Sequence, residues 1–276
     1  MMPTLATRFG RDRVQLTSER PLTDEQLRRV APSIFADGAH ASRSARYSYI
    51  PTIEVLRGLR ANGFDPYTVA QARTRDEANF GYTKHFLRLR HRSHLGTDQT
   101  NEIILLNSHN GSSSYQMLAG VFRYVCANGL ICGKTYHDIR VPHKGDARDQ
   151  VLDGAHVILR SFGLVTEARQ RMQATQLTRE EARAYGAAAL QLRYDGVHTA
   201  ISPAQAVEPR REQDRRTDLW TVLNVAQENL LRGGQPGRAA DGRSVTTRAI
   251  TAIDQGTALN RALWTLAEEM AKLKSA

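Results

Sequence analysis

The chain has 276 residues, of which 41% are hydrophobic and 24% are charged, a composition typical of soluble globular proteins and sufficient for one large domain or two ordinary ones. No apolar run approaches the roughly 20 residues of a membrane span, and the first residues do not resemble a secretory signal. Thirty-eight Lys and Arg against 28 Asp and Glu give a net charge of +10, which favours a polyanionic partner, nucleic acid before a membrane surface. A GC-rich genome would also raise the arginine count.

Only two cysteines are present, Cys126 and Cys132, and neither has a neighbouring cysteine pair. This spacing argues against a disulfide framework and against a cysteine-rich zinc site. Both cysteines fall in apolar segments, so we expect them to be core residues. The expected location is a reducing compartment, the cytoplasm, with no cofactor and no membrane association.

The amino-terminal half is expected to hold an irregular segment, residues 1–45, and an α+β core, residues 46–149. A capping box formed by Thr23 and Gln26 predicts one short helix in the first segment. In the core, a helix capped by Thr52 and ended by Gly63 precedes the strands. Three strands follow, at least two of them joined as an antiparallel hairpin, over residues 64–75, 84–92 and 101–107.

The next stretch, residues 107–134, predicts a polar turn followed by a helix. Leu118, Val121, Phe122, Val125 and Cys126 recur at helical spacing, which is the pattern of a core-facing helix. A further strand is expected after Asn128-Gly129. The predicted fold class is therefore α+β: a small antiparallel sheet of three to five strands, crossed by a core helix and followed by a mainly helical carboxyl-terminal half.

Residues 150–276 are expected to be helical and to pack on the core as one domain. A break near Gln176 and a second capping box, Thr178 to Glu181, predict a helical hairpin. A charged linker, residues 195–217, precedes two more helices. Between these helices lies a glycine-rich basic loop, residues 232–248, whose arginines are Arg232, Arg238, Arg243 and Arg248.

The strand over residues 84–92 carries the strongest functional signal. Alternation places four cations beside Phe86 on one face of the strand, and these cations are Lys84, Arg88, Arg90 and Arg92. Such a ribbon is suited to tracking a phosphate backbone, with Phe86 stacking on bases. Arg123 and Tyr124 are expected to supplement it, and the loop 232–248 to close over the bound strand. The alternative is an exposed strand face whose charges only confer solubility.

A hydrolase or nuclease centre is the weaker possibility. His109 lies beside the serines at 112–114, but no G-x-S-x-G elbow surrounds them. The predicted helix after this turn supplies no His, Asp or Glu, so a nuclease metal site would have too few ligands. We expect no metal, and we expect Asn110-Gly111 to form a tight turn.

The central block resembles a family of phage- and plasmid-associated proteins known as the domain of unknown function number 932. In that family an N-S-H-D/N-G-S-S turn leads to C-x-N-G-L-x-x-G, and the matching positions are Asn107, His109, Gly111, Ser112, Cys126, Asn128, Gly129 and Gly133. The resemblance runs from about residue 45 to residue 270 and implies residence on mobile elements. More loosely, the order helix, strand, hairpin, helix looks like the core of Redβ/RecT-type single-strand annealing proteins.

These observations predict a non-enzymatic, oligomeric DNA-binding protein of a mobile element that favours single strands. The alternative from another class is a protein that engages a host protein through the arginine strand and modulates defence. The third possibility is a hydrolase that uses His109.

Overall fold

The computed structural model describes residues 13–43, 47, 49–96, 98–124, 128–133, 136–142, 147–194 and 198–275. These residues form two compact units: Met1–Gly129 with Lys134–Phe162, here unit 1, and Leu130–Gly133 with Gly163–Ala276, here unit 2. The division falls inside a long helix, whereas the composition suggested a boundary at residue 150.

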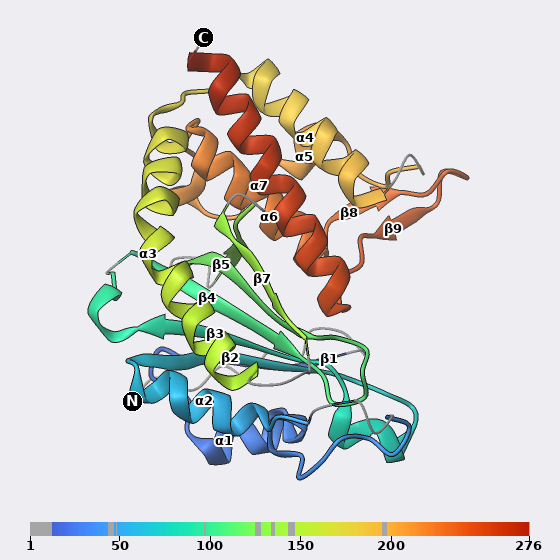
Figure 1. Ribbon diagram of the computed structural model, residues 1–276. Coiled ribbons are helices and arrows are strands. Elements are labelled where there is room, and N and C mark those ends of the chain that lie inside the picture. Colours follow the sequence, from blue (N-terminus) through green and yellow to red (C-terminus); the bar gives the residue numbers. More distant parts are fainter. Residues whose placement is uncertain are drawn as a thin grey trace. The chain divides into compact units, whose positions relative to one another are not determined.

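Unit 1 is built around an antiparallel sheet (Figure 1). The strands run in the order β1-β2-β3-β4-β5-β6, and β7 also pairs with β5. The strands are β1 (Arg13–Thr17), β2 (Phe64–Ala72), β3 (His85–His91), β4 (Gln99–Asn107), β5 (Tyr115–Arg123), β6 (Asn128–Ile131) and β7 (Asp138–Val141). The helical elements are α1 (Asp24–Val30), η1 (Pro32–Phe35), α2 (Thr52–Ala61), η2 (Glu77–Tyr82), η3 (Arg92–His94) and the first part of α3 (Ala147–Ala174).

The α+β class is confirmed, but the sheet has seven strands among the described residues and is larger than expected. The predicted core helix after Ser114 is wrong, because residues 115–123 form β5. Leu118 faces Ile104 and Phe122 faces Thr100 across the β4–β5 ladder. Because β5 is buried on both faces, its apolar residues are nearly continuous, and such a run fits a helical period as readily as a strand. Val125 and Cys126 lie outside the described residues.

The hairpin prediction is confirmed, since β2, β3 and β4 pair in sequence and antiparallel. The capping box of Thr23 and Gln26 is present at the start of α1. Helix α2 also forms, but Pro51 rather than Thr52 is its N-cap, which leaves the Thr52 hydroxyl directed into the interior. Gly63 ends the helix with a φ of +86°, where an added Cβ would lie 2.8 Å from His91 Nε2.

The first part of α3 packs against β5 and β7. At Gly154 an added Cβ would come within 2.3 Å of Met117 Cε and 3.1 Å of Ile139 Cγ2. An added methyl group would require the flexible end of the Met117 side chain to move and would press closely on Ile139. The glycine therefore allows α3 to pack closely on the side chains of β5 and β7.

Unit 2 is mainly helical, as expected. It contains the rest of α3, α4 (Arg179–Tyr194), α5 (Pro203–Ala206), η5 (Glu212–Asp214), α6 (Leu219–Arg232), a hairpin of β8 (Pro236–Arg238) and β9 (Ser244–Thr246), and α7 (Ile253–Ser275). The second capping box is present, because Thr178 N donates to Glu181 Oε2 at 2.7 Å and Glu181 N donates to Thr178 Oγ1 at 3.2 Å.

The core of unit 2 surrounds α6, which is buried from Leu219 to Leu230. Trp220 of α6 meets Trp264 of α7 edge to face, with ring centroids 5.8 Å apart. Tyr185 of α4 is also buried, and its hydroxyl donates to Leu263 O at 2.9 Å. Across the described ranges, none of the helices combines the length and the hydropathy that crossing a bilayer requires.

Candidate functional site

The arginines of β3 are not arranged as an exposed ribbon. Arg88 and Arg90 are only 6% and 1% exposed. Both contact Glu102 of β4, with Arg88 Nε 2.5 Å from Oε2 and Arg90 Nε 2.8 Å from Oε1. Glu102 lies on the same sheet face as the two arginines, because Arg88 pairs with Ile104 and residues two apart along β4 share a face. The expectation that these two charges face solvent is therefore wrong: a buried carboxylate neutralises part of their charge.

Aromatic rings enclose the Arg90 guanidinium. Its central carbon lies 4.3 Å from the Tyr67 ring centroid and 4.2 Å from the Phe122 centroid, and Nη1 donates to Tyr124 Oη at 3.2 Å. These are cation–π contacts at a desolvated site, where they are strongest. Burial also raises the pKa of the Tyr67 hydroxyl. The Arg90 charge is thus held by the fold, and the half-buried Tyr124 contributes to holding it.

The other predicted cations of this region differ in exposure. The Arg92 side chain is 60% exposed and forms two hydrogen bonds to Asp65, with Nε–Oδ2 2.7 Å and Nη2–Oδ1 3.0 Å. The hydrogen bonds and the charge of Asp65 raise the pKa of Arg92. Lys84 and Arg123 are half-buried, and Phe86, the expected stacking residue, is buried.

A chain of buried polar side chains lies on the opposite face of β3. Its centre is the hydroxyl of Thr52, the first residue of α2. Thr52 Oγ1 lies 2.9 Å from His85 Nε2, 3.0 Å from Asn107 Nδ2 and 3.1 Å from His109 Nε2. Tyr115 Oη is 3.3 Å away and donates to Ile50 O, and burial raises its pKa. One threonine hydroxyl therefore joins α2 to β3, to β4 and to the turn after β4.

The chain continues from His85 toward β2. His85 Nδ1 lies 2.9 Å from Ser33 Oγ, which donates to Gln71 Oε1 at 2.8 Å. Gln71 Nε2 in turn donates to Phe80 O at 2.7 Å. Because Ser33 donates its proton to Gln71, it accepts from His85, and this assigns the His85 proton to Nδ1.

With a single proton on the His85 ring, at Nδ1, the Nε2 atom accepts from the Thr52 hydroxyl. A hydroxyl accepts at most two further hydrogen bonds, and Asn107 Nδ2 and His109 Nε2–H supply them. Every donor in the chain thus points the same way, from His109 toward the Phe80 carbonyl. Such a directed, buried network rigidifies the segments that it joins.

The positions of His109 and of the serines after it can be compared with the hydrolase hypothesis. His109 is fully buried and its Nε2 faces Thr52. Ser112 Oγ donates to Asn110 Oδ1 and Ser113 Oγ donates to Ser114 O, so these hydroxyls serve the turn. Gly111 has a φ of +79°, which agrees with the predicted tight turn. Within the described part of the chain, no three His, Cys, Asp or Glu side chains are placed to hold a metal.

The basic loop of unit 2 forms the β8–β9 hairpin and is exposed. Arg238 ends β8, Arg243 directly precedes β9, Arg248 follows the hairpin, and all three are exposed. The Arg243 side chain, 77% exposed, pairs with Asp241, and this hydrogen bond lowers the Asp241 pKa. The hairpin is anchored at Ala200, whose carbonyl accepts from Arg238 N at 2.8 Å.

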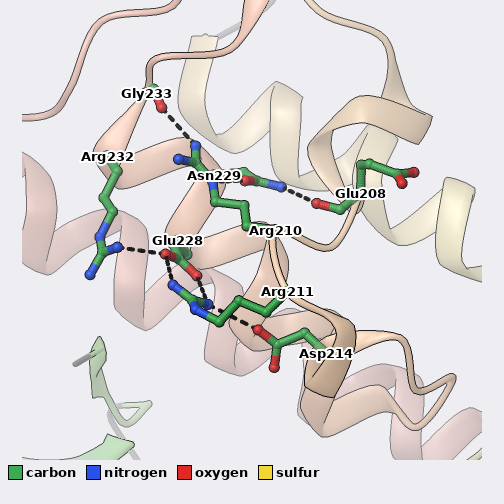
Figure 2. Close-up of polar contacts among 8 residues, drawn as sticks. All are labelled: Glu208, Arg210, Arg211, Asp214, Glu228, Asn229, Arg232 and Gly233. Carbon is green, nitrogen blue, oxygen red and sulfur yellow. Dashed lines mark hydrogen bonds and ion pairs between the residues drawn. The ribbon is translucent and has the colours of Figure 1, made fainter. Parts of the chain in front are cut away.

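Arg232 differs from the other three arginines of the loop because it belongs to a buried network (Figure 2). Its Nη1 lies 2.6 Å from Glu228 Oε1, and Arg211 contacts both Glu228 oxygens, at 2.7 and 2.5 Å. Arg211 also contacts Asp214 at 3.0 Å. The Glu228 side chain is 3% exposed. Arg232 is therefore held by the ion pairs of α6, and the exposed charge of the loop lies at and beyond the hairpin.

Asn229, beside Glu228 on α6, organises the segment before η5. Its Nδ2 donates to Ala206 O at 3.1 Å and Glu208 O at 3.0 Å, and its Oδ1 accepts from Arg210 Nε at 2.6 Å (Figure 2). Arg210 Nη2 also reaches Gly233 O at 2.7 Å. The expected linker 195–217 is thus fastened to α6 by side chains.

Sequence reasoning missed the polar chain from His109 to Gln71. The sequence does carry one signal for it. His85 and Gln71 are polar residues at strand positions whose neighbours on the same face are apolar, and this pattern indicates buried polar side chains. The expected burial of Cys132 is confirmed.

Comparison with known proteins identifies the sequence family to which this chain belongs. The profile described as "Domain of unknown function (DUF932)" matches residues 39–264, and the chain belongs to that family. Two Escherichia coli K12 proteins, "UPF0380 protein YafZ" and "UPF0380 protein YfjQ", are each 48% identical to it over 269 residues, which cover 98% of this chain and 98% of each relative. No solved structure matches. The likeness to Redβ/RecT-type proteins stays a prediction, and the crossing helix on which it partly rested is a strand.

Proposed function

We propose that this protein binds nucleic acid, with single-stranded DNA favoured, as a component of mobile elements. The observation that carries the proposal is the exposed basic hairpin of unit 2, together with the net charge of +10. Exposed arginines on a two-stranded hairpin can contact phosphates directly, because no buried ion pair has to break first.

The composition of the hairpin suits close approach to a phosphate backbone. Small residues separate its arginines, namely Gly237, Ala239, Ala240 and Gly242. The ion pair between Arg243 and Asp241 is exposed on both sides, at 77% and 52%, so it contributes little and a phosphate competes for the guanidinium readily. Anchoring at Ala200 limits the conformational entropy that binding would cost.

The proposal assigns a smaller part to unit 1 than its sequence suggested. Arg88 and Arg90 maintain the sheet, and binding by them would require disrupting the pair with Glu102. Arg92, Lys84 and Arg123 keep enough exposure to add phosphate contacts. Self-association along a bound strand belongs to the same proposal and would appear as a DNA-dependent increase in hydrodynamic size.

The triple variant Arg238→Ala, Arg243→Ala, Arg248→Ala is expected to bind a labelled single-stranded oligonucleotide about 10- to 100-fold more weakly at low salt. Because the variant makes three fewer phosphate contacts, its binding releases fewer counterions from the DNA. The slope of log affinity against log salt concentration should therefore become shallower by about 2. Fluorescence anisotropy at several salt concentrations measures both quantities.

The matched control is Arg171→Ala, Arg179→Ala, Arg183→Ala, which removes the same charge from exposed positions on α3 and α4. It should retain most of the affinity. Equal losses in the two triple variants would mean that only net charge matters, and wild-type protein that binds no oligonucleotide at low salt would refute the proposed function.

A further inference from the structure

We infer that Phe80 is a stacking surface for an unpaired base and that Arg73 and Arg75, on the same loop, contact the flanking phosphates. The inference rests on the proposed function. It would explain why the protein favours single-stranded over duplex nucleic acid, as that proposal states. Stacking on an aromatic side chain requires an unpaired base, because the faces of paired bases are covered by their neighbours in the duplex.

Phe80 is 48% exposed although it lies in an ordered element, η2, between β2 and β3. The carbonyl of Phe80 accepts from Gln71 Nε2 at 2.7 Å and from Thr83 Oγ1 at 3.3 Å. Asp76 caps the start of η2 through a 3.0 Å bond from Ala78 N to Oδ1. The ring is thus displayed by a backbone that is fixed on both sides.

The polar chain centred on Thr52 ends at this carbonyl. It couples the position of Phe80 to the turn that contains His109, through Ser33 and Gln71. That turn also docks directly on η2, since His109 N donates to Tyr82 O at 3.0 Å. The buried network therefore preorganises an exposed aromatic side chain, which lowers the entropy lost when a base stacks on it.

The segment between β2 and β3 that carries Phe80 also carries cations that could contact an anionic ligand. Arg73 and Arg75 are exposed and Lys84 is half-buried, whereas one of the two nearby carboxylates, Asp76, accepts the capping bond. Both acids of the loop, Asp76 and Glu77, are exposed. Among the described residues, the other large hydrophobic side chains with comparable exposure are leucines, which have no π-face for a base.

The test compares Phe80→Ala with Leu95→Ala, because Leu95 is equally exposed at 50% and lies in the β3–β4 connection of the same unit. Binding is measured by anisotropy with single-stranded DNA, single-stranded RNA and duplex DNA of one sequence. Phe80→Ala should lose about tenfold affinity or more for the single strands and little for the duplex. Leu95→Ala should bind as the wild type does, and Phe80→Trp should retain binding. The stronger of the two single strands identifies the natural ligand.

Unchanged single-strand affinity in Phe80→Ala would overturn this inference and leave the basic hairpin of unit 2 as the binding surface. An equal loss for duplex and single strands would also overturn it, because that result indicates a charge or folding effect. Wild-type protein that binds none of the three ligands refutes the proposed function itself. Thermal unfolding followed by circular dichroism verifies that the variants are folded.

Discussion

Replacement of Glu102 by alanine is expected to destabilise unit 1 by about 3–5 kcal/mol, because it removes the carboxylate that the two buried arginines Arg88 and Arg90 share. Both guanidinium groups lie within hydrogen-bonding distance of this one carboxylate. Urea unfolding followed by circular dichroism measures the loss. Hydrogen exchange of peptides from residues 85–107 should place it in β3 and β4.

The matched control is Glu269→Ala, which breaks an exposed ion pair with Lys272 and should cost less than about 1 kcal/mol. A second variant separates charge from packing. Replacing Glu102, Arg88 and Arg90 together by methionine should recover much of the stability, because the three charges of this cluster are then removed together. A loss below about 1 kcal/mol in Glu102→Ala would show that water reaches the two arginines.

The second large effect is expected for Thr52→Val, which keeps the shape of the side chain and removes the hydroxyl. His85, Asn107 and His109 would each lose a buried hydrogen-bond partner. Because a buried unsatisfied group costs about 1–3 kcal/mol and some of the three will re-pair, we expect a loss of about 2–4 kcal/mol. Chemical denaturation measures it, and faster exchange of the amides in η2 should accompany it.

Thr68→Val is the matched control. Thr68 is also buried in unit 1, and its hydroxyl donates to Thr17 Oγ1 at 3.2 Å. Its loss should be about 1 kcal/mol. If both substitutions cost the same, Thr52 is an ordinary buried hydroxyl and the polar chain does not rigidify η2.

The elements predicted well were those with strong local signals. The capping boxes at Thr23 and Thr178, and the hairpin β2–β3–β4, depend on residues close in sequence. Strand β5 was mistaken for a helix because a strand buried on both faces has no alternation to reveal it. The pairing of β5 with β4 determines that this segment is a strand, and the sequence of β5 alone does not reveal that pairing.

The arginines of β3 illustrate a different limit. Their alternation correctly placed Arg88 and Arg90 on one face, but alternation does not tell whether that face is covered. The deciding residue, Glu102, lies on another strand, and only the register with β3 brings it between the two arginines. Likewise the polar chain joins Ser33, Thr52 and His109 from three separate segments.

The shared carboxylate restricts how sequences of this family can diverge. A mutation that removes Glu102 first would pass through an intermediate in which two buried cations have both lost the carboxylate that they share, whereas loss of Arg88 first leaves one arginine paired with one glutamate. Substitutions at these positions should therefore occur in a preferred order, with an arginine changing before the acid. In an alignment of relatives, the three positions should covary, and sequences that retain both arginines should retain the glutamate.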